Sequence, residues 1–122
     1  MKKDSGRPER MKTYCFALDL DDDPALIAEY KQYHEMESIW PSVVQSALSH
    51  GVISEEIYLA GNRLFMILHT TGDFSLDAKR AADSANPEMQ KWEKLMWRFQ
   101  KPLPFAQPGE KWVLMEKIFE VK

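Results

Sequence analysis

The sequence predicts one α+β domain in which an antiparallel sheet carries helices on one face. Strand-like and helix-like stretches follow one another as β-α-β-β-α-β, if the two short helices of each crossover are counted together. A Gly-Asn pair at 61–62 separates the two middle strands and favours a tight antiparallel hairpin. The chain has 122 residues, of which 44% are hydrophobic, and this suffices for one domain with a substantial core.

The first strand and the first helix have clear local patterns. Residues 11–20 (MKTYCFALDL) alternate with the period of a strand that has two different faces. Asp23 suits an N-cap and Pro24 suits the first helical position, so the acidic run favours a helix start over a calcium loop. One face of this helix carries Leu26, Ile27, Tyr30, Tyr33 and His34.

Proline, glycine and the hydrophobic periods divide the rest of the chain. Pro41 disfavours a helical backbone at Trp40, so the chain turns there, and Gly51 suits the end of the next helix. The third strand is nearly continuously apolar, as expected for a strand that is covered on both faces. The expected elements are helix 42–50, strands 52–60 and 63–70, helices 73–85 and 87–99, a proline-rich arm 101–109 and a last strand 111–121.

Composition excludes several kinds of partner. The formal net charge of −3 provides no basic field for nucleic acid. No stretch approaches the length of a membrane span, and residues 1–10 lack the apolar core of a signal peptide. We therefore expect a flexible extension at 1–10 and a folded domain at 11–122. We also expect a cytoplasmic location, which a single cysteine, Cys15, suits.

Residues 28–41 (AEYKQYHEMESIWP) hold the main candidate site. Tyr30 and His34 lie four residues apart, so their side chains stack on one helical face. An imidazole changes its protonation state near neutral pH, and a phenol hydrogen-bonds to it or to a ligand. With the indole of Trp40 at the next turn, the three side chains suit a pocket for a carbohydrate or another small polar ligand. The alternative is structural, because aromatic residues and a lone histidine on such a face also occur in packed cores.

Motifs for metals, nucleotides and redox chemistry are absent from the sequence. It has no G-x-G-x-x-G, no P-loop, no C-x-x-C and no H-E-x-x-H. The three histidines, His34, His50 and His69, fall on separate elements without the spacing of metal ligands. We therefore expect no metal and no cofactor, and chemistry by side chains alone, which indicates proton transfer.

The predicted sheet has helices on one face only, so its other face needs a cover. A second copy of the chain is the simplest cover, and it would form a two-fold dimer. We therefore expect a homodimer.

Several short motifs occur together in this chain. The most specific is E-Y-x-x-x-H followed by I-W-P, which here is Glu29-Tyr30, His34 and Ile39-Trp40-Pro41. The others are His50-Gly51, Ile57-Tyr58-Leu59 before the hairpin, and Trp92 with Met96. Together they resemble the L-rhamnose mutarotase family, from about Lys12 to the C-terminus. The phrases ALDLDDDPALIAEY, GNRLFM and LPFAQPGEKW are similar to a subgroup that is associated with L-fucose as well as L-rhamnose.

The resemblance implies a fold, an activity and roles for individual residues. It implies a homodimeric α/β barrel of ferredoxin-like subunits that interconverts the α and β anomers of a 6-deoxy-hexose without metal or cofactor. In it, His34 matches the proton donor, Tyr30 a sugar-binding tyrosine, and Trp92 the first of a Trp-Trp pair that binds the sugar. We also expect Trp40 and Tyr58 to contact the sugar.

The sequence departs from the family pattern at three places. Glu93 stands where the second Trp of the pair is expected, and Glu55 stands in place of a second tyrosine. Met36 and Glu37 are extra residues between His34 and the I-W-P turn. The same barrel architecture also carries cofactor-free monooxygenases and non-catalytic ligand-binding dimers, and these remain the alternative function.

Overall fold

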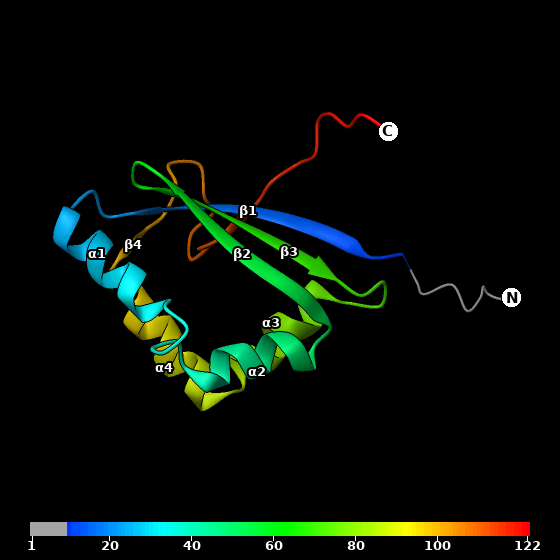
Figure 1. Cartoon of the computed structure of the whole chain (residues 1–122), viewed down its shortest axis with the longest axis horizontal. Helices are drawn as coiled ribbons and strands as arrows, with labels where there is room; N and C mark the ends of the chain where they lie inside the picture. Colours follow the sequence, from blue (N-terminus) through cyan, green and yellow to red (C-terminus); the bar gives the residue numbers. More distant parts are fainter. Residues whose placement is uncertain (1–9) are drawn as a thin grey trace, which may run out of the picture.

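A computed structural model describes residues 10–122, so the predicted extension at 1–10 lies outside the described residues except for Arg10. The described chain forms a five-stranded sheet with four helices on one of its faces (Figure 1). The strands are β1 (Lys12–Leu20), β2 (Val52–Ala60), β3 (Arg63–Thr70), β4 (Gln100–Lys101) and β5 (Val113–Leu114). The helices are α1 (Pro24–Tyr33), α2 (Pro41–Ser49), α3 (Leu76–Ser84) and α4 (Pro87–Met96).

The strands lie in the order β2-β3-β1-β4, and all pairs are antiparallel. β1 pairs with β3 along nearly its whole length, from Lys12 opposite Thr70 to Asp19 opposite Arg63. Helices α1 and α2 connect β1 to β2, and α3 and α4 connect β3 to β4. This is the βαββαβ topology of a ferredoxin-like fold, and the predicted fold class is confirmed.

The hairpin between β2 and β3 is fixed to the end of β1. Gly61 has a φ of 62°, in the left-handed region that glycine adopts without a steric penalty. The carbonyl of Asn62 accepts a hydrogen bond from the Leu20 amide at 2.7 Å. The Asn62 side-chain amide donates to the Leu20 carbonyl at 2.9 Å, so one turn residue holds both backbone groups.

Side-chain caps decide where three of the helices begin. Asp23 accepts hydrogen bonds from the first turn of α1, which confirms the capping interpretation of the acidic run. Ser75 caps α3 and Asn86 caps α4 in the same way. Because Ser75 is the cap, α3 begins at Leu76 and not at the predicted residue 73.

The end of the chain differs from the prediction. α4 ends at Met96, before the predicted residue 99, and β4 follows it directly. β4 and β5 both pair with β1, the first at Leu20 and the second at Phe16. The predicted strand 111–121 is therefore reduced to the two residues of β5. Residues 102–112 leave the sheet edge between β4 and β5, because their prolines lack the N–H that a ladder needs.

Two hydrophobic clusters form the core between the sheet and the helices. The first contains Leu20, Tyr30, Leu64, Met89, Trp92, Met96 and Phe99. The second contains Phe16, Ala47, Val52, Leu68 and Phe74. Trp112 packs against both clusters, so the segment that leaves the sheet edge returns to the core.

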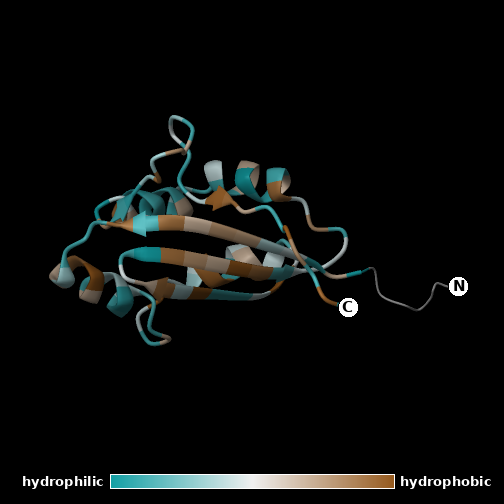
Figure 2. Cartoon of the chain, turned by 90° about the horizontal axis from the view of Figure 1, so that it is seen from above, coloured by the Kyte–Doolittle hydropathy of each residue, from teal (hydrophilic) through white to brown (hydrophobic). Residues whose placement is uncertain are grey.

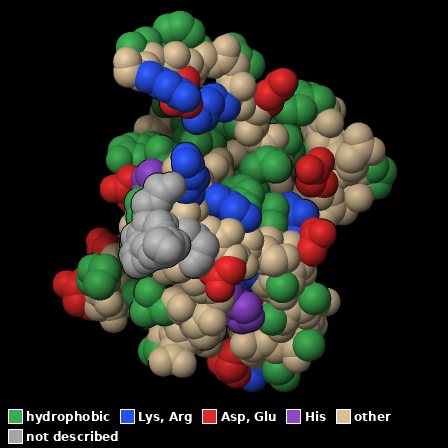
Figure 3. Space-filling model, turned by 90° about the vertical axis from the view of Figure 1, so that its right-hand side faces the viewer, with side chains coloured by type: hydrophobic (Ala, Val, Ile, Leu, Met, Phe, Trp, Pro, Cys, Tyr) green, Lys and Arg blue, Asp and Glu red, His purple; other side chains and the backbone are tan. Residues whose placement is uncertain are grey.

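The other face of the sheet carries no helix of the described chain. Viewed from above, the long strands lie side by side and are hydrophobic along much of their length (Figure 2). Strand alternation places Cys15, Phe65 and Ile67 on this face, and all three are half-buried. The side of the molecule in Figure 3 carries basic and acidic side chains interspersed with hydrophobic ones. Within residues 10–122, no helix has the length and apolarity to cross a membrane.

Phe99 tests the packing of the first cluster, because its side chain has no exposed surface. We expect Phe99→Ala to lower the free energy of unfolding by about 3–5 kcal/mol, since it leaves a cavity among packed side chains. Phe105 is 66% exposed, and Phe105→Ala is the matched control, with an expected change below about 0.5 kcal/mol. Urea unfolding followed by tryptophan fluorescence measures both, and equal effects would contradict this core.

Candidate active site

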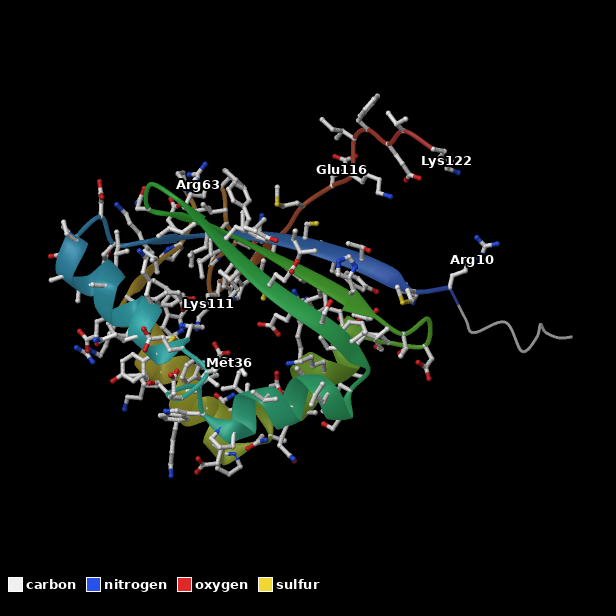
Figure 4. All side chains as sticks on the ribbon, viewed as in Figure 1. Arg10, Met36, Arg63, Lys111, Glu116 and Lys122 are labelled. Atoms are coloured by element: carbon white, nitrogen blue, oxygen red, sulfur yellow. The ribbon has the colours of Figure 1, made fainter. Side chains whose placement is uncertain are left out.

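A cavity of about 570 Å³ lies between the helices and the sheet. All four helices of the described chain and strands β1 to β4 contribute side chains to its wall. Lys111, from the segment that leaves the sheet edge, and Met36, from the turn after α1, also line it. In Figure 4 both labelled residues lie between the sheet and the helices. The volume falls in the range of small-molecule sites.

His34 lies at the end of α1, where its orientation is fixed by the helix backbone. Its Nδ1 lies 2.8 Å from the carbonyl oxygen of Tyr30, one turn earlier. A carbonyl only accepts, so Nδ1 carries the proton, and in the neutral ring the lone pair is on Nε2. Burial lowers the pKa of His34, and the bond to the Tyr30 carbonyl opposes this shift. The imidazole is therefore a neutral base at neutral pH.

Aromatic rings enclose the imidazole. The rings of Tyr30 and His34 are 4.3 Å apart between centroids, and Trp92 meets His34 edge-on at 5.4 Å. Trp92 is buried and lines the cavity. Trp40 contacts Trp92 edge-on at 5.2 Å but does not line the cavity, so it supports Trp92 from behind. The structure thus brings together Tyr30, His34 and Trp92, the three residues that the family resemblance matched. Trp40, which we also expected to contact the sugar, does not reach the cavity.

Gln100 and Tyr30 form the buried polar part of the wall. The Gln100 side-chain amide donates to the Tyr30 hydroxyl at 3.4 Å. Burial raises the pKa of Tyr30 to about 12, with smaller contributions of the same sign from Glu55 and Glu93, and the Gln100 bond opposes the shift. The Tyr30 phenol therefore keeps its proton. The Oε1 atom of Gln100 is buried without a hydrogen-bond partner in the described chain.

Three acidic side chains line the cavity, and two of them are paired. Asp83 accepts hydrogen bonds from Ser46 at 2.5 Å and from Lys79 at 2.6 Å. Glu93 pairs with Lys111, whose ammonium also lies 4.7 Å from the centre of the Trp97 ring.

Glu55 is the third acidic side chain. The structure gives it no hydrogen bond or ion pair to residues 10–122. The loss of hydration within the cavity raises its pKa, Lys79 opposes the shift, and Asp83 adds to it.

The sequence predicts that Tyr58 contacts the sugar, but in the structure Tyr58 does not line the cavity. Ile57 faces the cavity, so its neighbour Tyr58 points to the other face of the sheet, where it is 53% exposed. The same alternation, counted from Ile57, places Glu55 inside. Gln100 and Lys111 also line the cavity, and no pattern in the sequence marks either of them as a site residue. Among residues 10–122, no group of three or more His, Cys, Asp or Glu side chains is arranged to hold a metal ion.

The sequence of this chain is similar to those of known proteins. Residues 13–121 match the family model for L-rhamnose mutarotase. An L-fucose mutarotase of Xanthomonas campestris pv. campestris is 46% identical over 109 residues, which is 89% of this chain and 87% of that protein. A protein of Dictyostelium discoideum is 34% identical over 115 residues, which is 90% of each chain.

A solved structure also matches. The crystal structure of an L-rhamnose mutarotase from Formosa agariphila aligns with a TM-score of 0.65, at 20% identity, and covers 91% of this chain and 99% of that chain. At this identity the match shows the shared fold. The family and curated matches confirm the resemblance drawn from the sequence motifs.

The Glu93–Lys111 pair is tested by a double-mutant cycle. We expect Glu93→Gln and Lys111→Met to be coupled by about 1 kcal/mol in the free energy of unfolding, because the Lys111 side chain is 11% exposed. The Glu88–Lys91 pair is the matched control, with side chains 57% and 68% exposed and an expected coupling of about 0.2–0.5 kcal/mol. Urea unfolding of the single and double variants measures both, and a Glu93–Lys111 coupling no larger than the control would contradict a stabilising role for the mostly buried Lys111 side chain.

Proposed function

Because the chain belongs to the L-rhamnose mutarotase family, we propose that it interconverts the α and β anomers of a 6-deoxy-hexose, L-fucose or L-rhamnose. The supporting observation is the neutral imidazole of His34, held beside a buried phenol in the wall of a cavity of sugar-binding size. The relative at 46% identity carries the name L-fucose mutarotase, which favours L-fucose as the first sugar to test. The match to a sugar isomerase family favours this activity over the monooxygenase and binding-protein alternatives.

The reaction opens the pyranose ring and closes it on the other face of the carbonyl. Opening requires a base for the proton of the anomeric hydroxyl and an acid for the ring oxygen. General acid–base catalysis of this kind contributes about 10²–10⁴-fold to the rate. Because its pKa is lowered, His34 stays neutral to a lower pH than free histidine and accepts the first proton at Nε2.

The other wall residues suit the binding of a deoxy-sugar. Trp92 offers an apolar ring to the methyl group and the C–H face of the sugar. The Tyr30 hydroxyl, which keeps its proton, hydrogen-bonds a sugar hydroxyl. None of these contacts requires a metal or a cofactor.

The proposal predicts that His34 is essential and that a geometrically matched histidine is not. His50 ends α2 as His34 ends α1, with its Nδ1 2.8 Å from the Ser46 carbonyl, but it does not line the cavity. We expect His34→Asn to lower anomer exchange of L-fucose at least about 100-fold and His50→Asn to leave it unchanged. NMR saturation transfer between the anomeric protons measures the rate. Equal rates in wild type and His34→Asn would rule out His34 as the proton-transfer group.

We also propose a homodimer in a cytoplasmic location. The uncovered sheet face, with Cys15, Phe65 and Ile67, is the surface that a second copy would cover.

A charge placed on this sheet face tests the dimer. Ile67→Glu buries a carboxylate in that interface, so we expect it to weaken the dimer at least about tenfold. Ala78→Glu, on the exposed surface of α3, is the control and should not change the assembly. Sedimentation equilibrium measures both, and a wild-type protein that sediments as a monomer would contradict the dimer.

A further inference from the structure

A mutarotase needs two proton transfers, and His34 accounts directly for one. In the neutral ring the only proton is on Nδ1, where it is engaged by the Tyr30 carbonyl. The ring therefore has no proton to give at Nε2 until it has accepted one. A separate acid at the ring oxygen would allow both transfers to occur in one step.

Glu55 faces the cavity from the sheet side, whereas His34 faces it from the helix side. On β2, Glu55 pairs with Leu68, which is buried in the second hydrophobic cluster. Ile57, two residues further on, pairs with Met66, which packs against the same cluster. This side of β2 is therefore turned toward the helices, and both Glu55 and His34 line the cavity.

The neighbouring charges are already engaged with one another. Lys79 and Ser46 bind Asp83, and Lys111 binds Glu93. Within the described chain this leaves Glu55 as the acidic group of the cavity with no hydrogen-bond or ion-pair partner. Glu55 stays exposed to solvent at the cavity wall, and a carboxyl group that lines a cavity without a partner is suited to meet a ligand.

We propose that Glu55 is the second catalytic residue, and that its carboxyl group protonates the ring oxygen while Nε2 of His34 deprotonates the anomeric hydroxyl. The proposal rests on the mutarotase function proposed above. It also gives a role to the acidic residue that replaces a family tyrosine.

The step balances without an oxidant, a reductant or a co-reactant. His34 takes the hydroxyl proton, the O–H electron pair becomes the second bond of the C1 carbonyl, and the bond between C1 and the ring oxygen breaks onto that oxygen. The ring oxygen takes the proton of Glu55, which leaves a carboxylate, an imidazolium and the open-chain aldehyde. After rotation about the C1–C2 bond, the reverse transfers close the ring on the other carbonyl face and restore both groups.

The electrostatics of the cavity support this division of roles. Glu55 keeps exposed surface, but the loss of hydration on its cavity side raises its pKa, and burial lowers the pKa of His34. The acid form of Glu55 thus persists to a higher pH, and the base form of His34 to a lower pH, than in free side chains. The titratable and charged groups that line the cavity with them are Tyr30, Lys79, Arg80, Asp83, Glu93 and Lys111.

The experiment compares Glu55→Gln with wild type in L-fucose anomer exchange by NMR saturation transfer, across pH and sugar concentration. Glutamine keeps the shape of the side chain and removes the acid. We expect kcat to fall at least about 100-fold with little change in KM. The wild-type profile should be bell-shaped, whereas Glu55→Gln should rise with pH to a plateau, because only the ionisation of His34 remains.

Glu56→Gln is the matched control, because it changes the adjacent carboxyl group, which points to the other face of the sheet. It should keep the wild-type rate and profile. A Glu55→Gln protein with wild-type kcat, or with a raised KM alone, would overturn the proposal for Glu55, while loss of exchange in His34→Asn would leave the mutarotase function standing. Absence of exchange in the wild-type protein would instead overturn the proposed function itself.

Discussion

The hydrogen bond between Nδ1 of His34 and the carbonyl of Tyr30 is the constraint on which the site depends. The last carbonyls of a helix have no partner within the helix, so a side chain four residues later is well placed to bind one. The bond survives when the ring takes up a second proton, because Nδ1 carries hydrogen in both forms. The imidazole therefore gains and loses a proton at Nε2 without reorienting, which proton transfer in a closed site requires.

This local geometry does not make a site by itself. His50 forms the same bond to the Ser46 carbonyl at the end of α2, with the same 2.8 Å distance. The two histidines differ in what surrounds them. His34 is enclosed by Tyr30 and Trp92 in the cavity wall, whereas the Nδ1 of His50 also meets the exposed Ser49 hydroxyl. Tertiary packing thus separates a candidate catalyst from a helix cap.

The sequence predicted the features that local chemistry determines. The bounds of β2 and β3 are as predicted, because Gly51 and the Gly61-Asn62 turn mark them. The face of each β2 residue was harder to predict, because a register shift between Val52 and Ser54 changes the phase of the alternation. A count from Val52 would therefore mislead about which residues of β2 reach the cavity, and only the observed pairing separates Glu55 from Tyr58.

The rest of the site depends on contacts between distant parts of the chain. Gln100 reaches Tyr30 across 70 residues of sequence, and no local pattern marks such a pair. Lys111 enters the cavity because residues 102–112 leave the sheet edge and return. The sequence indicates a proline-rich arm there, but which residue of this segment lines the cavity depends on where β5 pairs with β1.

The charges of the cavity wall indicate the kind of ligand that fits. Glu55, Asp83 and Glu93 face Lys79, Arg80 and Lys111, so the wall carries no strong excess of either sign. Such a wall gives little attraction to a phosphate or carboxylate ligand, whereas an uncharged sugar needs hydrogen bonds and an apolar ring to pack on. A flat apolar ligand would cover the carboxyl group of Glu55 without a hydrogen bond, at a cost of about 1–3 kcal/mol. A sugar hydroxyl would hydrogen-bond to that carboxyl group, so the polar wall favours a polyol over the aromatic ligand of the alternative function.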